Sequence, residues 1–413
     1  MPFFEYESCE GERKAGGGRF NLPRAWKRWR DCMVLALFAA FFLTLQPTQA
    51  AATNGFFPLW QKNPPNAADT VLIYQGGSDR LPWTPDQFAP YVSYRDPRDG
   101  RGKWLFDGFL FIEYRTRVAT EIRTFSEGEG NGKWPPADKR NWLQLLDKSF
   151  EPGHGVAALE HCCAETEKRV GAPLRRRQVI LTLPEPIDNY TNWGELSGHK
   201  LNFSVRADRV AASEWYVAQA REKWRALAPK HLVLAGFYFV PERAQNSNPQ
   251  MLPLVSQKIH EHGLKFFWIP YWHAKGAGDW KALGFDLASQ QPNYFFHTNL
   301  PYSHLQAACD FARAHGMGME MELDDRIISQ TKTFAPRFEA YLQAFAANGV
   351  QDSASMSYYE GGGTILRLAQ SNDQTLHSDY DRIAQWVLDR QLRADEQFRR
   401  ATLEPTGNLS SLR

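Results

Sequence analysis

The chain has 413 residues, of which 43% are apolar and 14% aromatic, so it can form one large domain or two smaller ones. The formal net charge is +2, with acids and bases mixed along the chain, which argues against a nucleic-acid-binding surface. The 14 Trp residues serve as core filler or, at strand ends, as platforms for sugar rings.

The N-terminal 52 residues resemble a targeting segment. Basic residues between positions 24 and 30 precede an apolar run, Met33–Leu45, and the small residues Ala50–Ala52 follow it. This order is typical of a secretory signal peptide, so we expect a secreted or periplasmic protein with no membrane contact after cleavage. A membrane anchor is the alternative, although the run is too short to span a bilayer comfortably.

The cysteines outside this segment are Cys162, Cys163 and Cys309. A vicinal pair is not a zinc spacing, and three cysteines cannot form a disulfide framework. We interpret them as ordinary thiols, with one disulfide to Cys309 as the alternative. We expect no metal and no cofactor.

Residues 53–69 are rich in Pro and Asn and indicate a linker or first loop, and strand-like and helix-like segments alternate from there to residue 400. The expected strands are Thr70–Gln75, Phe106–Tyr114, Val179–Leu183, His231–Val240, Leu264–Trp272, Tyr294–His297, Met317–Leu323 and Ala354–Tyr359. The expected helices are Arg140–Phe150, Gly155–Val170, Asp208–Ala228, Pro249–His262, Trp280–Gln290, Tyr302–His315, Thr333–Asn348 and Asp379–Arg399. Residues 401–413 indicate a flexible tail.

This alternation predicts a parallel sheet with right-handed crossovers. Eight strands over residues 70–400 predict an α/β fold, a single (β/α)8 barrel of the TIM type. An open doubly wound sheet is the rival, but the turn Gln75-Gly76-Gly77 lacks the dinucleotide-binding fingerprint. In such a barrel the site lies at the carboxyl ends of the strands.

The segment from Gly316 to Asp324 has two distinct faces when read as a strand. One parity carries Met317, Met319, Met321 and Leu323, and the other carries Gly316, Gly318, Glu320, Glu322 and Asp324. Stacked acids repel one another and lose hydration when buried, which indicates a site rather than a core.

The fourth expected strand ends close to a glutamate. Gly236, Tyr238, Val240 and Glu242 share one parity, which places Glu242 on the inner side with Tyr238. By analogy with retaining barrel glycosidases, we expect Glu242 to be the acid/base and Glu322 or Glu320 the nucleophile, with Glu322 slightly favoured because it lies nearer the strand end. The carboxyl groups would lie about 5–5.5 Å apart in a retaining enzyme and about 6.5–9.5 Å apart in an inverting one.

Other polar and aromatic side chains at the strand ends are candidates for binding substrate. They are Glu113, Glu185, Trp193, Tyr238, Tyr271, Trp272, His273, Asn299, Asp324, Tyr359 and Glu360. Several have structural alternatives: Glu113 pairing with an Arg, Glu185 bracing a loop between two prolines, and Glu360 forming a turn. A cation held by Glu320, Glu322 and Asp324 is a further alternative.

A family resemblance extends from about Leu72 to Arg390. The segments that carry it are Phe106–Phe111, Leu181–Pro186, Asn192–Glu195, Ala235–Tyr238, Phe266–Trp272, Gln290–Tyr294, Gly316–Glu322 and Tyr358–Gly362. They resemble the bacterial domain-of-unknown-function family 4855, which is similar to secreted barrel proteins found beside polysaccharide-degrading systems. The resemblance implies a glycoside-hydrolase-like barrel and a compartment, and it assigns no catalytic pair.

Together these patterns favour a secreted glycoside hydrolase acting on a poly- or oligosaccharide with two carboxyl groups. A non-catalytic glycan-binding barrel and a polysaccharide lyase are the alternatives. A lyase needs a base such as His273 or a Tyr and a group that neutralises a uronate, and Lys and Arg are scarce at the expected strand ends.

Overall fold

The computed structural model describes residues 55–77, 79–127 and 132–403. The predicted signal peptide and most of the predicted tail lie outside these residues. Among the residues that are described, no helix is both long and apolar enough to cross a membrane.

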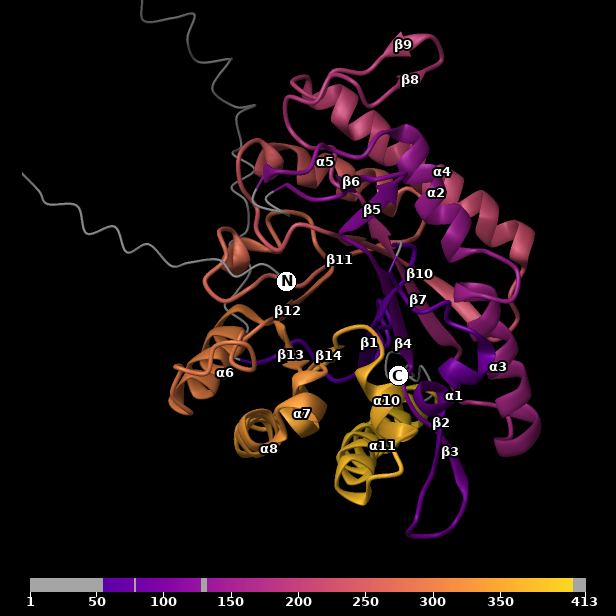
Figure 1. Ribbon diagram of the computed structural model, residues 1–413, viewed down its shortest axis with the longest axis vertical. Coiled ribbons are helices and arrows are strands. Elements are labelled where there is room, and N and C mark those ends of the chain that lie inside the picture. Colours follow the sequence, from indigo (N-terminus) through magenta and orange to yellow (C-terminus); the bar gives the residue numbers. More distant parts are fainter. Residues whose placement is uncertain (1–54, 78, 128–131, 404–413) are drawn as a thin grey trace, which may run out of the picture. The chain divides into compact units, whose positions relative to one another are not determined.

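Eight parallel strands form a closed barrel with helices around it, which confirms the predicted fold (Figure 1). The barrel strands are β1 (Asp69–Tyr74), β4 (Gly108–Ile112), β7 (Arg177–Leu183), β10 (Leu232–Phe239), β11 (Lys265–Trp268), β12 (Leu287–Gln290), β13 (Gly318–Glu322) and β14 (Met356–Tyr359). They neighbour one another in chain order, and β14 pairs with β1 to close the ring.

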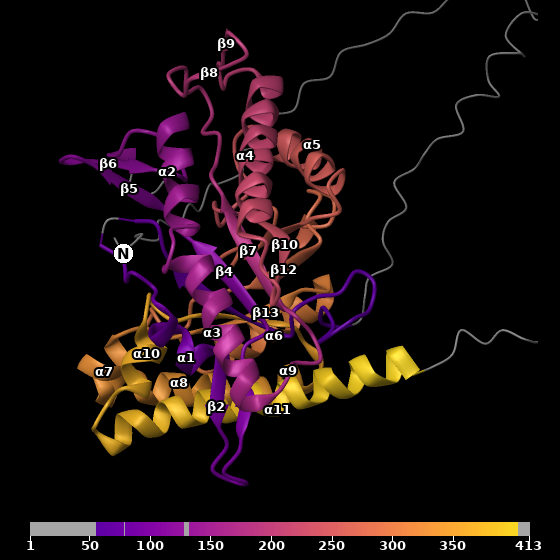
Figure 2. The same cartoon turned by 90° about the vertical axis from the view of Figure 1, so that its right-hand side faces the viewer.

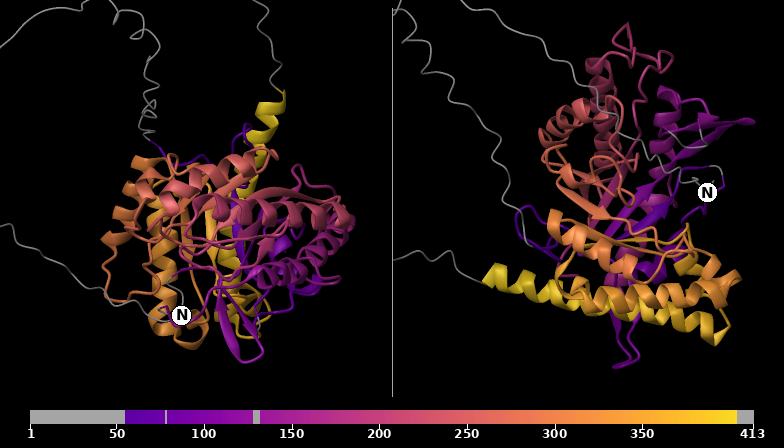
Figure 3. Two further views of the ribbon diagram at one scale, coloured as in Figure 1. Left: turned by 90° about the horizontal axis from the view of Figure 1, so that it is seen from above. Right: turned by 90° about the vertical axis from the view of Figure 1, so that its left-hand side faces the viewer.

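The helices are α1 (Pro85–Val92), α2 (Lys139–Ser149), α3 (Gly155–Val170), α4 (Arg206–Leu227), α5 (Asn248–His260), η2 (Ala277–Asp279), α6 (Ser303–His315), α7 (Arg326–Ser329), α8 (Thr331–Ala347), α9 (Val350–Ser353), α10 (Thr364–Ala369) and α11 (Gln374–Leu403). Three small hairpins extend the loops: β2–β3 (Ser93–Arg95, Gly102–Trp104), β5–β6 (Arg115–Val118, Glu121–Thr124) and β8–β9 (Glu195–Leu196, His199–Lys200). Figure 3 shows the helices covering the strands from two further directions.

The sixth strand was predicted in the wrong place. Residues 280–290 were expected to be helical and 294–297 to be the strand, but β12 covers Leu287–Gln290 and the only helix between β11 and β12 in this described stretch is the short η2. The strand is Leu-Ala-Ser-Gln, and its inward side chains are Leu287 and Ser289. It therefore lacks the apolar signal of a buried strand, whereas the aromatic residues that suggested one follow it in a loop.

The two faces predicted for β13 are confirmed. Met317, Met319 and Met321 are fully buried in the main core between strands and helices. On the other face, a Cβ atom on Gly318 would come within 3.0 Å of the Ser355 and Ser289 side chains, which line the barrel interior. Glu320 and Glu322 share that inner face.

Residues 55–68 are not a detached linker, because they bond to the amino-terminal end of the barrel. The Phe57 backbone N–H donates to the Met317 carbonyl over 2.9 Å, and the Leu59 N–H donates to the Ser353 carbonyl over 2.7 Å. Cys162, Cys163 and Cys309 are free and buried, so the alternative of a disulfide to Cys309 is wrong.

Helix α11 lies beside α8 (Figure 2), where Arg382 pairs with Glu339. Its Arg390 is fully buried and bonds Asp69 of β1 over 2.5 Å. The same guanidinium donates to the carbonyls of Ala68 and Ala354, which precede β1 and β14. One buried arginine therefore ties α11 to the seam where the barrel closes.

Removing this arginine is expected to be costly. Arg390→Ala leaves the buried Asp69 carboxylate without its cation, so we expect a loss of about 3–5 kcal/mol in the free energy of unfolding. Arg393→Ala on the same helix breaks an exposed pair with Asp352 and should cost less than about 1 kcal/mol. Denaturant unfolding measures both, and equal losses would contradict the account.

A histidine joins α3 to the start of β10. His231 Nδ1 and Nε2 each lie 2.7 Å from a carboxylate oxygen, of Glu160 and Glu167 respectively. The two carboxylates raise the His231 pKa against the opposing effect of burial. This stabilisation is therefore complete below the unfolded pKa of about 6.5 and is lost as pH rises through the higher folded pKa. The difference in urea midpoint between the wild type and His231→Gln should shrink steadily as pH rises through that range.

Candidate active site

The carboxyl ends of the barrel strands bring four tyrosines and three glutamates together. Tyr74, Tyr114, Tyr238 and Tyr359 belong to the cluster inside the barrel. Tyr74 packs on Tyr114 with ring centroids 6.3 Å apart and on Tyr359 at 5.8 Å. These tyrosines lie with Glu242, Glu320 and Glu322 at the carboxyl end of the barrel, here termed the mouth.

Glu242 is half-buried in the loop after β10 and accepts a hydrogen bond of 2.9 Å from the Tyr114 hydroxyl. Its charge raises the pKa values of both Glu320 and Glu322, although burial is the larger cause in each case. Tyr238 lies on the inner face of β10. Burial raises the pKa of its hydroxyl, and the charges of Glu242 and Glu320 raise it further. The charge of Glu242 therefore acts on both carboxyl groups of β13.

Glu322 is held by its surroundings. Its Oε1 accepts from the Asn293 backbone N–H over 3.0 Å and from the Asn293 amide over 3.4 Å, while the Tyr341 hydroxyl of α8 donates to Oε2. Burial raises its pKa to about 8, against the opposing effect of these hydrogen bonds. Glu322 is therefore fixed between the loop after β12 and helix α8.

Glu320 differs from its neighbour. It is 2% exposed, and its Oε1 has no hydrogen-bond partner among the described residues. Burial, followed by the charges of Glu322 and Glu242, raises its pKa well above the usual range. Of the two glutamates on β13, Glu320 is therefore the one with a carboxyl oxygen that lacks a hydrogen-bond partner among the described residues.

Two of the predicted substrate-binding glutamates are internal braces. Glu113 is fully buried and forms a two-point ion pair with Arg80, at 2.7 and 2.9 Å. Glu185 accepts 2.7 Å and 2.6 Å hydrogen bonds from the Asn248 amide and the Glu127 backbone N–H, and burial raises its pKa to about 7. Both carboxyl groups have their oxygens engaged by protein donors and hold loops in place.

Glu360 and Trp193 are also structural. Glu360 is fully buried and accepts from the Tyr91 hydroxyl at 2.9 Å and the Ile365 backbone N–H at 3.0 Å. Trp193 is 1% exposed and packs against Trp142 at 5.3 Å, so neither ring face is open to a sugar.

The loop after β11 bonds to the loops that follow β10 and β12. The Tyr271 backbone N–H donates to the Glu242 carbonyl over 3.3 Å. Trp272 stacks on His273 at 4.3 Å, and the Trp272 N–H donates to the Asn293 side chain over 2.7 Å. Asn299 is exposed and lies nine positions beyond Gln290, the true end of the sixth strand (299 − 290), so its prediction as a strand-end residue was wrong.

Asp324 pairs with Arg326 at 2.8 Å, and its charge raises the pKa of Tyr359 after the larger effect of burial. Asp324 therefore lies beside the mouth, and its negative charge is already balanced by Arg326. Within residues 55–77, 79–127 and 132–403, no group of three or more His, Cys, Asp or Glu side chains is arranged to hold a metal ion.

Strained backbone conformations gather in the loops that follow the barrel strands. Non-glycine residues with positive φ in these loops are Trp83, Ala119, Asn189, Ser197, Asn246, His273 and Asn293. Such strain costs about 1–3 kcal/mol per residue and tends to occur where function requires it. Asn293, at φ 54°, is the residue that holds Glu322.

Sequence reasoning missed four residues of this site: Tyr74, Tyr114, Asn293 and Tyr341. Strand parity could have placed Tyr74 and Tyr114 inside the barrel, because each lies at or just after the end of its strand. Asn293 was hidden by the misplaced sixth strand. Tyr341 lies within α8, and nothing local in the sequence marks it.

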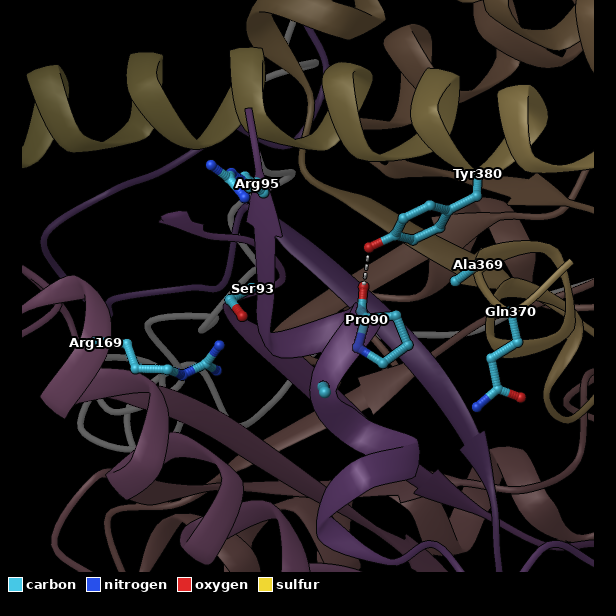
Figure 4. A pocket seen from close by; sticks show the side chains of 8 residues that line it. Pro90, Ser93, Arg95, Arg169, Ala369, Gln370 and Tyr380 are labelled. Atoms are coloured by element: carbon cyan, nitrogen blue, oxygen red, sulfur yellow. Dashed lines mark hydrogen bonds between the residues drawn. The ribbon is translucent and has the colours of Figure 1, made fainter. Parts of the chain in front are cut away.

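A separate pocket lies outside the barrel between α1, β2, α3, α10 and α11 (Figure 4). Arg95, Arg169 and Gln370 contribute polar groups, and Tyr380 donates to the Pro90 carbonyl over 3.1 Å. The residues that line this pocket include no carboxylate, so it does not offer the acid/base chemistry of the mouth.

A family model described as a domain of unknown function, DUF4855, matches residues 69–385. The chain belongs to this family. The match agrees with the resemblance to family 4855 seen in the sequence, and it covers all eight barrel strands. No curated protein sequence matches the chain significantly.

Solved structures are similar to the chain at the level of the barrel. A proposed alpha-L-fucosidase from Bacteroides thetaiotaomicron shares 13% identity at a TM-score of 0.42, covering 83% of this chain and 97% of that one. A family GH18 chitinase catalytic domain from the fern Peteris ryukyuensis shares 12% at 0.35, covering 57% and 81%. A tryptophan synthase alpha-subunit from Pyrococcus furiosus shares 7% at 0.36, covering 81% and 99%. These names belong to different reactions, and no activity is transferred from them.

Proposed function

We propose that this family 4855 protein is a glycoside hydrolase that acts on a poly- or oligosaccharide, with Glu242 and Glu320 as its two reacting carboxyl groups. The observation that carries the proposal is that the charge of Glu242 acts on Glu320 at the carboxyl end of the barrel, while the two glutamates lie in unlike environments. Glycoside hydrolysis needs such a pair, with one carboxyl group protonated and the other ionised.

The environments favour a particular division of roles. Glu320 is buried near two other carboxyl groups, and both effects raise its pKa, which suits it to donate a proton to the glycosidic oxygen as that bond breaks. Glu242 is half-buried and accepts a hydrogen bond from the Tyr114 hydroxyl. Glu242 is then the nucleophile or the base that activates water, which reverses the roles expected by analogy from the sequence.

The tyrosines at the mouth suit a sugar substrate. Tyr114 and Tyr359 are partly exposed at the mouth, where ring faces can pack on sugar C–H groups and hydroxyls can bond to sugar hydroxyls. Arg80 is bound to Glu113 and Arg326 to Asp324, so neither is available to neutralise the uronate carboxylate of a lyase substrate.

We also propose that the mature protein acts outside the cytoplasm, on the basis of the signal-like pattern in residues 1–52. N-terminal sequencing of the protein recovered from the periplasm or the medium tests this. A mature chain beginning near Ala52 supports cleavage, and an intact N-terminus in the membrane fraction supports an anchor.

The function is tested with a panel of bacterial and plant polysaccharides and their oligosaccharides. Release of reducing ends without absorbance from a new double bond indicates hydrolysis, and that absorbance indicates a lyase. Saturable binding with no product from any glycan would overturn the enzyme assignment in favour of a binding barrel.

A further inference from the structure

A small cavity lies inside the barrel, below the carboxyl groups of the mouth. Its polar wall contains Ser289 from β12, Ser355 just before β14 and Ser357 within β14. Leu110 and Ile180 contribute to its apolar wall. Its volume is about 20 Å³, and roughly 10–15 Å³ is enough for one water molecule.

The cavity is unusual for this fold, since the interior of a (β/α)8 barrel is normally filled by bulky branched side chains. Here β13 contributes Gly318, on which a Cβ atom would come within 2.8 Å of Ser355 Oγ and 3.0 Å of Ser289 Oγ. The same Cβ atom would come within 2.7 Å of the Ser355 carbonyl oxygen, so a larger residue would displace the backbone before β14 as well as the two hydroxyls.

Three polar atoms in and beside this space have no hydrogen-bond partner among the described residues. They are the side-chain oxygens Ser355 Oγ and Ser357 Oγ and the Glu320 Oε1 atom. A buried polar group left without a partner costs about 1–3 kcal/mol, so the space favours an occupant that both donates and accepts.

Ser357 connects the cavity to Glu320. The two residues are partners in the β13–β14 register, and Ser357 opposes the rise in the Glu320 pKa as a hydrogen-bonding neighbour. They are within reach of one another but not aligned into a bond, because Ser357 Oγ remains without a partner. An occupant of the cavity can align that hydroxyl.

We propose that the cavity is a binding site for one water molecule, which orients the Ser357 hydroxyl onto Glu320 and so holds the Glu320 carboxyl group in place. Ser357 is then a positioning residue for Glu320, and its role in a reaction depends on the proposed function. The other ionisable groups that face Glu320 are Glu242 and Tyr238 from β10 and its loop, Glu322 from β13, Tyr359 from β14 and Tyr341 from α8.

The test measures the proton on Glu320 directly. An infrared pH titration of the wild type minus that of Glu320→Gln isolates the carboxyl band of Glu320 without any substrate. Ser357→Ala should lower the proton-dissociation constant of Glu320 about three- to tenfold, because the ionised form loses a hydrogen bond. Ser355→Ala, which changes the cavity but not the residue paired with Glu320, should shift it less and in the same direction.

Ser256→Ala is the matched control, since Ser256 is a buried serine on α5 that bonds the Gly284 carbonyl and should leave the Glu320 titration unchanged. An unchanged Glu320 titration in a folded Ser357→Ala variant would overturn the inference.

A high-resolution crystal structure gives a second test. A water peak bonded to Ser357 is the expected result, and a cavity without a water peak would contradict the inference. Inactivity on every glycan would refute the proposed function while leaving both of these results interpretable.

Discussion

Glu242→Gln is expected to lower kcat/KM on a hydrolysed glycan by about 10³-fold or more, while the glycan still binds. Glutamine keeps the shape and the hydrogen bond from Tyr114 but cannot carry the negative charge of a nucleophile or a base. Initial rates of reducing-end release, together with calorimetric binding to the same oligosaccharide, separate chemistry from affinity.

Glu195→Gln is the control for that substitution, because Glu195 is an exposed glutamate on the β8–β9 hairpin. It should retain wild-type turnover. Substantial turnover by Glu242→Gln would remove Glu242 from the reaction, and loss of both turnover and folding would be seen as a changed unfolding midpoint.

Glu320→Gln is expected to lose about 10²–10⁴-fold on natural glycans, the usual contribution of a general acid. On an aryl glycoside with a good leaving group the loss should be small, since that bond breaks without a proton. Glu242→Gln should remain inactive on both substrates. The opposite pattern, with Glu242→Gln rescued by the leaving group, would restore the roles expected from sequence analogy.

The acid/base roles also predict the shape of the pH profile. The raised pKa of Glu320 extends its protonated form to higher pH than that of an ordinary glutamic acid, so wild-type kcat/KM should hold up on the alkaline side until Glu320 ionises. In Glu320→Gln this alkaline limb should disappear for the aryl substrate. A limb that persists in this variant would assign the titration to another group.

The sequence predicted the fold well because a parallel barrel repeats two simple patterns. Buried strands are short apolar runs, and the helices between them show an amphipathic period. The prediction failed at β12, where Leu-Ala-Ser-Gln offers only one large apolar residue. The residues of β12 do not mark it as a strand, and it is recognised only from its pairing with β11 and β13 in the structure.

Strand parity predicted that Glu320 and Glu322 share the inner face of β13, and the same reasoning was extended to Glu242, which lies in the loop after β10. What parity cannot give is the hydrogen-bond partner of each carboxylate. Glu113, Glu185 and Glu360 look like rim residues in the sequence, yet Arg80, Asn248 and Tyr91 engage them from distant parts of the chain. The choice between Glu320 and Glu322 likewise depends on Tyr341, far along the chain.

The buried Arg390 has a consequence for the order of events during synthesis. The seam between β1 and β14 joins the first and last strands of the barrel, and the guanidinium that bonds beside both strands comes from a residue made only near the end of translation. Until then Asp69 has no cation to accompany it into the interior. We therefore expect a nascent chain that stops before residue 390 to remain open at this seam and accessible to proteases, and a chain that includes it to close.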